Sequence, residues 1–68
     1  MAAEAKERGN TAFREQNWPL ALREYEEAIK RDPKEPAYQN NLAATLCKVM
    51  DFQGAKRAVD KALELDPK

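Results

Sequence analysis

Residues 18–33 read WPLALREYEEAIKRDP, and residues 52–67 repeat the pattern as FQGAKRAVDKALELDP. Matching positions in the two segments are 34 residues apart, including both closing Asp-Pro pairs. In residues 18–33 the apolar side chains fall at helical spacing on one side, and the charged side chains take the other. A fixed offset of this size is typical of helical repeat proteins, so the sequence predicts an all-α fold built from two copies of one unit.

The remainder of the chain supplies a second helix for each unit. We expect helices over about residues 2–15, 18–31, 36–49 and 52–65, and no strand. This divides the chain into a first repeat, residues 1–33, and a second repeat, residues 34–68. Pro19 and Pro36 suit the first turns of their helices, where no backbone N–H is needed. Asp51 is expected to cap the last helix.

Small residues recur at the same offset, at positions where helices must approach each other closely. The pairs are Gly9 with Ala43, Ala21 with Ala55, and Ala28 with Ala62. A glycine inside a helix costs about 1 kcal/mol relative to alanine. Gly9 therefore predicts that another helix passes close to the backbone of the first. The predicted apolar side of the third helix comprises Leu42, Ala43, Leu46, Val49 and Met50.

These positions resemble the tetratricopeptide repeat (TPR) over essentially the whole chain. That family has a small residue in its first helix (helix A), Ala-x-x-x-aromatic in its second (helix B), a later alanine and a closing proline. The first repeat carries Gly9, Ala21, Tyr25, Ala28 and Pro33, and the second carries Ala43, Ala55, Val59, Ala62 and Pro67. The second repeat departs from the pattern, since Val59 replaces the aromatic residue. The resemblance implies four antiparallel helices forming a right-handed α-solenoid fragment without a capping helix.

Composition excludes several classes of function. The chain has 12 basic and 12 acidic side chains, so no general attraction to nucleic acid or membrane is expected. It has neither serine nor histidine and its two glycines are isolated, which predicts no enzyme, no cofactor and no phosphate-binding loop. One cysteine without histidine predicts no metal site. The lack of a signal peptide or an apolar span favours a cytoplasmic location.

Polar donors gather on one predicted groove. Lys6 and Asn10 are four residues apart and share one face of the first helix, and Arg14 continues that line. This face should lie away from residues 18–31, which are expected to touch no ligand. Asn41 should face the same groove from the third helix, and Lys48 is the 34-residue counterpart of Arg14. The predicted peptide-binding residues are therefore Lys6, Asn10, Asn41, Arg14 and Lys48.

Lys6, Asn10 and Asn41 also match, in type and spacing, the dicarboxylate-clamp subclass of TPR domains. These domains occur in stress-induced, chaperone-organising co-chaperones, where such residues grip the Glu-Glu-Val-Asp C-termini of the seventy- and ninety-kilodalton heat-shock chaperones. The phrases AIKRDP and NLAA resemble the repeats of that co-chaperone. The resemblance implies a non-enzymatic protein–protein interaction module. The full clamp takes a further lysine and arginine from a third A helix, so residues 1–68 are expected to form a partial clamp.

Other interpretations stay open. Asparagines at these positions are common in TPR repeats generally, where they serve helix contacts. The chain could therefore be a structural or self-assembling scaffold, natural or engineered. In such a scaffold, replacing Lys6 would not change the assembly. Single-stranded RNA is disfavoured because no stacking aromatics accompany the charges. Each repeat of an array leaves an apolar face for its neighbour. We therefore expect homo-oligomers through the uncapped face, formed face to face or by helix exchange.

Overall fold

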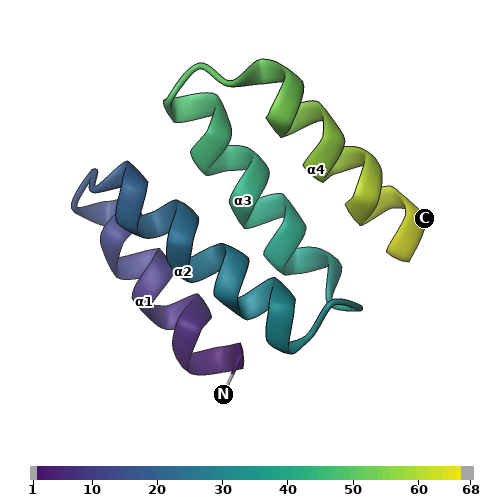
Figure 1. The fold of residues 1–68 in the computed structure, drawn as a ribbon, viewed down its shortest axis with the longest axis horizontal. Coiled ribbons are helices and arrows are strands. Elements are labelled where there is room, and N and C mark those ends of the chain that lie inside the picture. The colour runs from purple at the N-terminus through teal and green to yellow at the C-terminus, as the bar shows by residue number, and fades with distance from the viewer. Residues whose placement is uncertain (1, 67–68) are drawn as a thin grey trace.

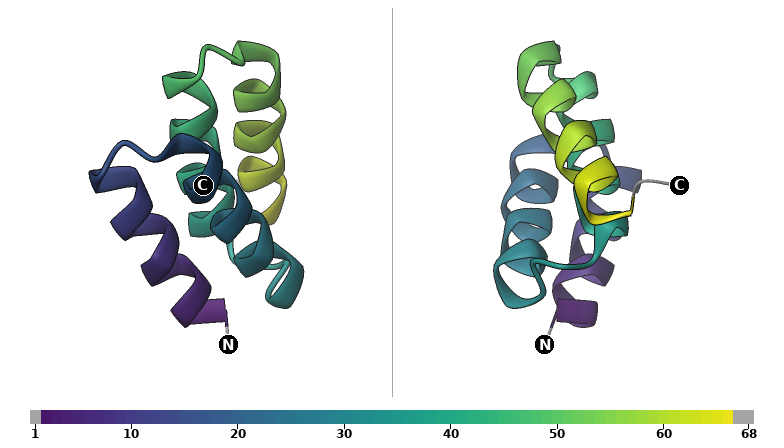
Figure 2. Two further views of the ribbon diagram at one scale, coloured as in Figure 1. Left: turned by 60° about the vertical axis from the view of Figure 1, so that its left-hand side comes forward. Right: turned by 90° about the vertical axis from the view of Figure 1, so that its right-hand side faces the viewer.

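The structure is a computed structural model that describes residues 2–66. Within this range it contains four α-helices: α1 (Ala2–Arg14), α2 (Trp18–Arg31), α3 (Pro36–Lys48) and α4 (Phe52–Leu65). α1 and α2 form one antiparallel hairpin and α3 and α4 form a second (Figure 1), and the hairpins stack through α2 against α3. Figure 2 shows the two hairpins from two further sides. The predicted all-α fold of two helix-turn-helix units is confirmed.

Both A helices, α1 and α3, end one residue earlier than predicted, and they end in the same way. Gln16 and Met50, 34 residues apart, have positive φ angles of 61° and 66°. The residue after each, Asn17 or Asp51, donates its backbone N–H to the carbonyl five residues earlier, at 2.8 or 2.9 Å. This bond is the mark of a Schellman closure, which satisfies the last carbonyls of a helix and turns the chain sharply. The repeat is therefore preserved in how its helices terminate.

The following helices begin as the sequence predicted. Pro19 lies in the first turn of α2, and Pro36 is the first residue of α3. Asp51 caps α4, because its carboxylate accepts a hydrogen bond from the backbone N–H of Gly54 at 3.0 Å. Asn17, the counterpart of Asp51, makes no such side-chain bond at the start of α2. The two B helices therefore start with different caps.

The core consists largely of alanines, and two tyrosines fill the wider spaces between helices. The buried alanines are Ala5, Ala12, Ala21, Ala28, Ala43, Ala55, Ala58 and Ala62. Tyr25 is 2% exposed and Tyr38 is 9% exposed. Small side chains let helix backbones come close together, so this core is packed tightly although few large aliphatic residues are fully buried.

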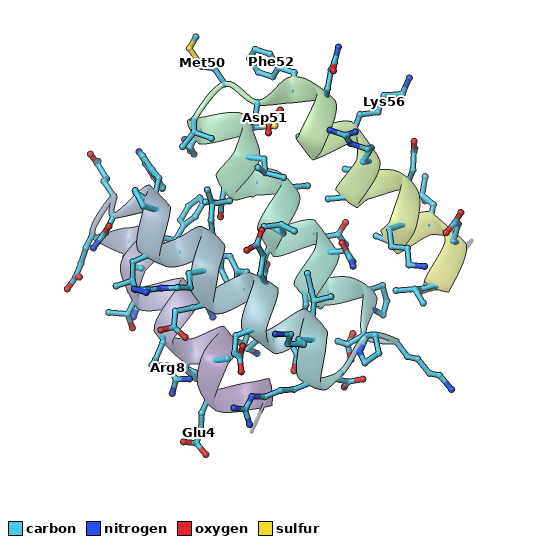
Figure 3. The ribbon with its side chains drawn as sticks, in the orientation of Figure 1. Glu4, Arg8, Met50, Asp51, Phe52 and Lys56 are labelled. Atoms are coloured by element: carbon cyan, nitrogen blue, oxygen red, sulfur yellow. The ribbon has the colours of Figure 1, made fainter. Side chains whose placement is uncertain are left out.

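The predicted apolar side of α3 is wrong at its C-terminal end. Val49 and Met50 are 39% and 75% exposed, because α3 ends before them and they lie in the α3–α4 turn. Met50 and Phe52 project away from the helices at this turn (Figure 3). The other three residues of that predicted side pack into the core. The prediction thus carried the apolar pattern of the helix two residues too far, into the turn.

Gly9 marks the close helix approach that the sequence predicted. A Cβ atom at Gly9 would lie 2.5 Å from Cε1 of Tyr25 and 2.6 Å from its Cδ1. Carbon atoms do not pack at such distances, so the ring of Tyr25 lies directly on the bare backbone of α1. Ala43 and Val59 take these two places in the second repeat. A valine lacks the ring that would meet the alanine methyl group.

Replacing Gly9 with alanine should destabilise the fold, although alanine is the better helix former by about 1 kcal/mol. The added methyl group must displace the Tyr25 ring, and overpacking of this kind costs about 1–3 kcal/mol. We expect a net loss of about 1 kcal/mol, measured by urea denaturation. Thr11→Ala, at an exposed position of the same helix, is the control and should not destabilise the fold, because alanine is the better helix former there too and the change adds no atom to a packed contact. A Gly9→Ala chain more stable than its parent would contradict the close packing.

Candidate functional site

Both asparagines predicted for the site line one pocket. Its volume is about 230 Å³, and its walls are Asn10, Phe13, Tyr25, Asn41 and Ala44. Asn10 and Phe13 come from α1, Tyr25 comes from α2, and the other two come from α3. The pocket therefore combines two amide groups with aromatic and aliphatic surface. Such a lining suits a ligand that has a polar end and an apolar side chain.

The side chain of Asn10 is held by a hydrogen bond across the first hairpin. The Tyr25 hydroxyl donates to Asn10 Oδ1, and the two oxygens are 2.6 Å apart. Asn10 is half-buried, and Tyr25 is almost fully buried. The sequence predicted that the Asn10 face lies away from residues 18–31 and that those residues touch no ligand site. The first prediction is wrong at Tyr25, which bonds to Asn10. Tyr25 is also a wall of the pocket, and the absence of a ligand contact stays a prediction.

This hydrogen bond gives different roles to the two ends of the Asn10 amide. The oxygen is engaged by Tyr25, while the NH2 group keeps two donors that a ligand can use. Burial raises the pKa of the Tyr25 phenol, and the positive charge of Arg14 lowers it by a smaller amount. The phenol therefore remains protonated at neutral pH, as a donor to the amide oxygen must be.

Asn41 reaches the pocket from a different position in its repeat. It lies 31 residues after Asn10, so its 34-residue counterpart is Glu7, while the counterpart of Asn10 is Ala44. Asn41 is half-buried, and its backbone carbonyl accepts a hydrogen bond from Thr45 Oγ1 at 3.0 Å. Within residues 2–66 no hydrogen bond engages its side chain. The whole amide group of Asn41 is thus available to a ligand.

The three predicted cations lie on the helices of the pocket but are not among its walls. Lys6 is half-buried one turn before Asn10, and Arg14 is exposed one turn after it. Arg14 donates from Nη2 to Thr11 Oγ1 at 3.4 Å. Lys48 is exposed in the last turn of α3. The structure therefore brings the two asparagines together and leaves Lys6, Arg14 and Lys48 on the flanks.

The flanking cations keep their charge available in the part of the chain that the structure describes. Ion pairs in this part of the chain join Arg8 to Glu24 at 3.0 Å, Arg31 to Glu27 at 2.9 Å, and Lys61 to Glu64 at 3.7 Å. None of them includes a predicted site residue. The unneutralised charges can attract an anionic ligand over a Debye length, roughly 8 Å at physiological salt.

Three walls of the pocket were not predicted from the sequence, and they are Phe13, Tyr25 and Ala44. Tyr25 is the one of the three that bonds to a predicted site residue. Its place in the amphipathic repeat predicted burial, and burial does not say what its hydroxyl contacts. A signal was present, because Asn10 and Tyr25 are replaced together in the second repeat, by Ala44 and Val59. Cys47 is exposed and lies outside the pocket.

The acidic side chains of residues 2–66 do not gather into a metal site, since no three His, Cys, Asp or Glu residues in this range are placed to hold an ion. Nor does any helix in the same range combine the length and the apolar character that crossing a bilayer requires.

Several proteins of known sequence contain a segment similar to this chain, although no family model matches it. It is 43% identical over 68 residues to Stress-induced-phosphoprotein 1 of Caenorhabditis elegans, covering 100% of this chain and 21% of that protein. It is 44% identical over 64 residues to Hsp70-Hsp90 organizing protein 2 of Arabidopsis thaliana, covering 94% of this chain and 11% of that protein. The chain therefore spans only 11–21% of the length of these relatives.

The chain is also similar to a segment of a phosphatase and to a solved TPR domain. Serine/threonine-protein phosphatase T of Aspergillus oryzae is 38% identical over 66 residues, covering 97% of this chain and 14% of that protein. The complex of the TPR2B domain of yeast Sti1 with pHsp70 matches with a TM-score of 0.95 and 41% identity, over 97% of this chain and 53% of that chain. This chain thus has the tetratricopeptide-repeat fold, as two helix-turn-helix repeats, and it is similar to segments of the Hsp70–Hsp90 organizing proteins.

Proposed function

We propose that residues 1–68 act as a non-enzymatic peptide-binding module of a co-chaperone. The proposed ligand is the acidic C-terminal peptide of a heat-shock chaperone, of the Glu-Glu-Val-Asp type. It lies in the groove that Lys6, Asn10 and Asn41 form, with Arg14 and Lys48 at the edges. The observation that carries the proposal is the meeting of Asn10 and Asn41, from neighbouring A helices, at one pocket.

The chemistry of this groove fits a C-terminal aspartate, which carries one carboxylate on its side chain and another at the chain terminus. Both carboxylates accept hydrogen bonds from ammonium and amide donors, and charge-assisted bonds contribute about 1.5–3 kcal/mol each. The donors here are fixed on helices, so little of their freedom remains to be lost on binding. Phe13 and Ala44 supply apolar surface in the same pocket, which suits the valine before the aspartate.

These 68 residues are proposed to bind such a peptide weakly. The resemblance to clamp domains assigns two further cations to a third A helix, and the described residues contain two A helices, α1 and α3. The absence of two charge-assisted bonds corresponds to a loss of several kcal/mol, roughly a hundredfold or more in affinity. The module is therefore proposed as part of a clamp.

The names of the relatives support two classes of chaperone as partners. The Arabidopsis relative is an Hsp70-Hsp90 organizing protein, and the yeast domain was solved in complex with pHsp70. We propose that the seventy- and ninety-kilodalton heat-shock chaperones both present their C-termini to this groove. A cytoplasmic location belongs to the same proposal, and the unpaired, exposed Cys47 agrees with a reducing compartment.

We propose in addition that the chain forms homo-oligomers through the apolar face of α4. A groove of about 320 Å³ lies between the start of α3 and α4, and its apolar walls include Val59, Ala62 and Leu63. Val59 is 41% exposed and Leu63 is 52% exposed. Large aliphatic side chains beside a groove are a favourable surface for another helix.

The register of the repeat supports a helix as the occupant of this groove. The residues 34 positions before the three apolar walls from α4 are Tyr25, Ala28 and Ile29. In the first repeat α3 covers that face, and Tyr38 packs with Ala28 and Ile29. A second copy of the chain offers an equivalent surface, through its own α4 or through an exchanged hairpin. Self-association through α4 is also expected if the chain is a scaffold that holds helices and binds no peptide tail.

Titration with a peptide ending Glu-Glu-Val-Asp tests the binding proposal. The peptide with a free C-terminus should bind more tightly than its C-terminal amide, because the amide lacks one carboxylate. Lys6→Ala should weaken binding of the free acid by about tenfold or more, since one charge-assisted bond is lost. Chemical-shift titration by NMR measures these affinities even when they are weak.

The matched control is Lys56→Ala, which removes an exposed lysine on α4, outside the pocket (Figure 3). This variant should bind as the parent does. Equal binding of the acid and the amide by the parent, together with equal binding by Lys6→Ala, would reject the clamp and favour the scaffold.

Sedimentation velocity over a range of concentrations tests self-association. The average mass of the parent should rise with concentration, and Leu63→Lys should return the chain to monomers because a charge would be buried in an apolar contact. Phe52→Lys is the control, since Phe52 is 61% exposed but is not a wall of the α4 groove. A compact monomer of the parent at high micromolar concentration would contradict the proposal.

A further inference from the structure

We infer that Tyr25 is a positioning residue of the carboxylate site: its hydroxyl holds the Asn10 amide so that the NH2 group is presented to the ligand. The inference rests on the proposed function. It adds to the groove a residue of helix B that acts through a residue of helix A, across the first hairpin.

An asparagine alone does not choose which end of its amide meets a ligand. The last side-chain torsion of asparagine is broad and roughly two-fold, so the oxygen and the NH2 group can exchange places. One arrangement offers donors to a carboxylate, and the other offers an oxygen that repels it. A site for carboxylates therefore gains affinity when a neighbouring donor engages the amide oxygen before the ligand arrives.

Tyr25 is placed to be that donor. Its hydroxyl lies 2.6 Å from Asn10 Oδ1, and its ring is fixed against Gly9, with 2% of the residue exposed. The ring therefore cannot swing away to release the amide unless the first hairpin opens. Asn10 is also a wall of the pocket, so its remaining donors are next to the space that a ligand can enter.

The second repeat indicates that the hydroxyl is not required for the fold. The residues Gly9, Asn10 and Tyr25 are replaced 34 positions later by Ala43, Ala44 and Val59. There the α3–α4 hairpin packs with no hydroxyl at the position of Val59 and no amide at the position of Ala44. The first repeat thus has all three features together: the aromatic ring, the glycine on which it packs and the amide to which it bonds. The second repeat has none of the three at the equivalent positions.

A double-mutant cycle in binding separates a positioning role from a structural one. Tyr25→Phe keeps the ring against Gly9 and removes only the hydroxyl, and Asn10→Ala removes the group on which the hydroxyl acts. We expect Tyr25→Phe to weaken binding of the free-acid peptide about 3- to 10-fold. In the Asn10→Ala background the same substitution should change the affinity less than about twofold, because no amide remains to be oriented. Thermal melts of the variants check that each is folded.

The possible outcomes are distinct. If Tyr25→Phe binds as tightly as the parent, while Lys6→Ala and Asn10→Ala bind more weakly, the positioning role is overturned and the proposed function stands. If Tyr25→Phe weakens binding equally with and without Asn10, the hydroxyl acts on the fold and the inference is again overturned. If Lys6→Ala, Asn10→Ala and the C-terminal amide all leave binding unchanged, the proposed function and the inference both fail.

Discussion

The ring of Tyr25 rests on the backbone of Gly9, and much of the first hairpin depends on this contact. A methyl group at Gly9 would lie 2.5 Å from the ring, so the spacing of α1 and α2 at this point is set by an aromatic ring packed on bare backbone. The same ring carries the hydroxyl that bonds Asn10 at 2.6 Å. One packing contact therefore sets the spacing of the two helices and also holds the tyrosine hydroxyl beside an amide of the pocket.

The two kinds of helix contribute differently to the proposed site. α1 and α3 supply the amides and flank them with cations, whereas α2 supplies the tyrosine wall that supports one amide. α4 forms no wall of this pocket, and its exposed residues Val59 and Leu63 line a separate groove. A peptide tail and a second chain would thus use different surfaces, so the two proposals do not compete for the same residues.

The fold could be predicted from the sequence because it is set by a repeat of 34 residues. The offset of 34 residues, the helical spacing of apolar residues and the prolines predicted four helices whose ends agree with the structure to about one residue. The remaining differences at Val49 and Met50 have a local cause. α1 and α3 close on Gln16 and Met50 with positive φ, and neither residue is the glycine that usually signals such a closure.

The site was predicted less completely than the fold. The pocket unites Asn10 and Asn41 as predicted, because positions on neighbouring A helices face a common groove. Lys6, Arg14 and Lys48 lie outside its walls, since long side chains on helix surfaces are not positioned by the repeat pattern. The Tyr25 contact was missed because amphipathic spacing assigns a residue to the core without showing where its polar atom points.

In the proposed clamp, the Asn10 and Asn41 amides receive a carboxylate of the peptide. The most direct measurement follows their side-chain NH2 signals by NMR while a peptide ending Glu-Glu-Val-Asp is added, first as the free acid and then as the C-terminal amide. The proposed clamp predicts that both side-chain signals move with the free acid and move much less with the amide. Signals that stay in place while residues of α4 respond would contradict it.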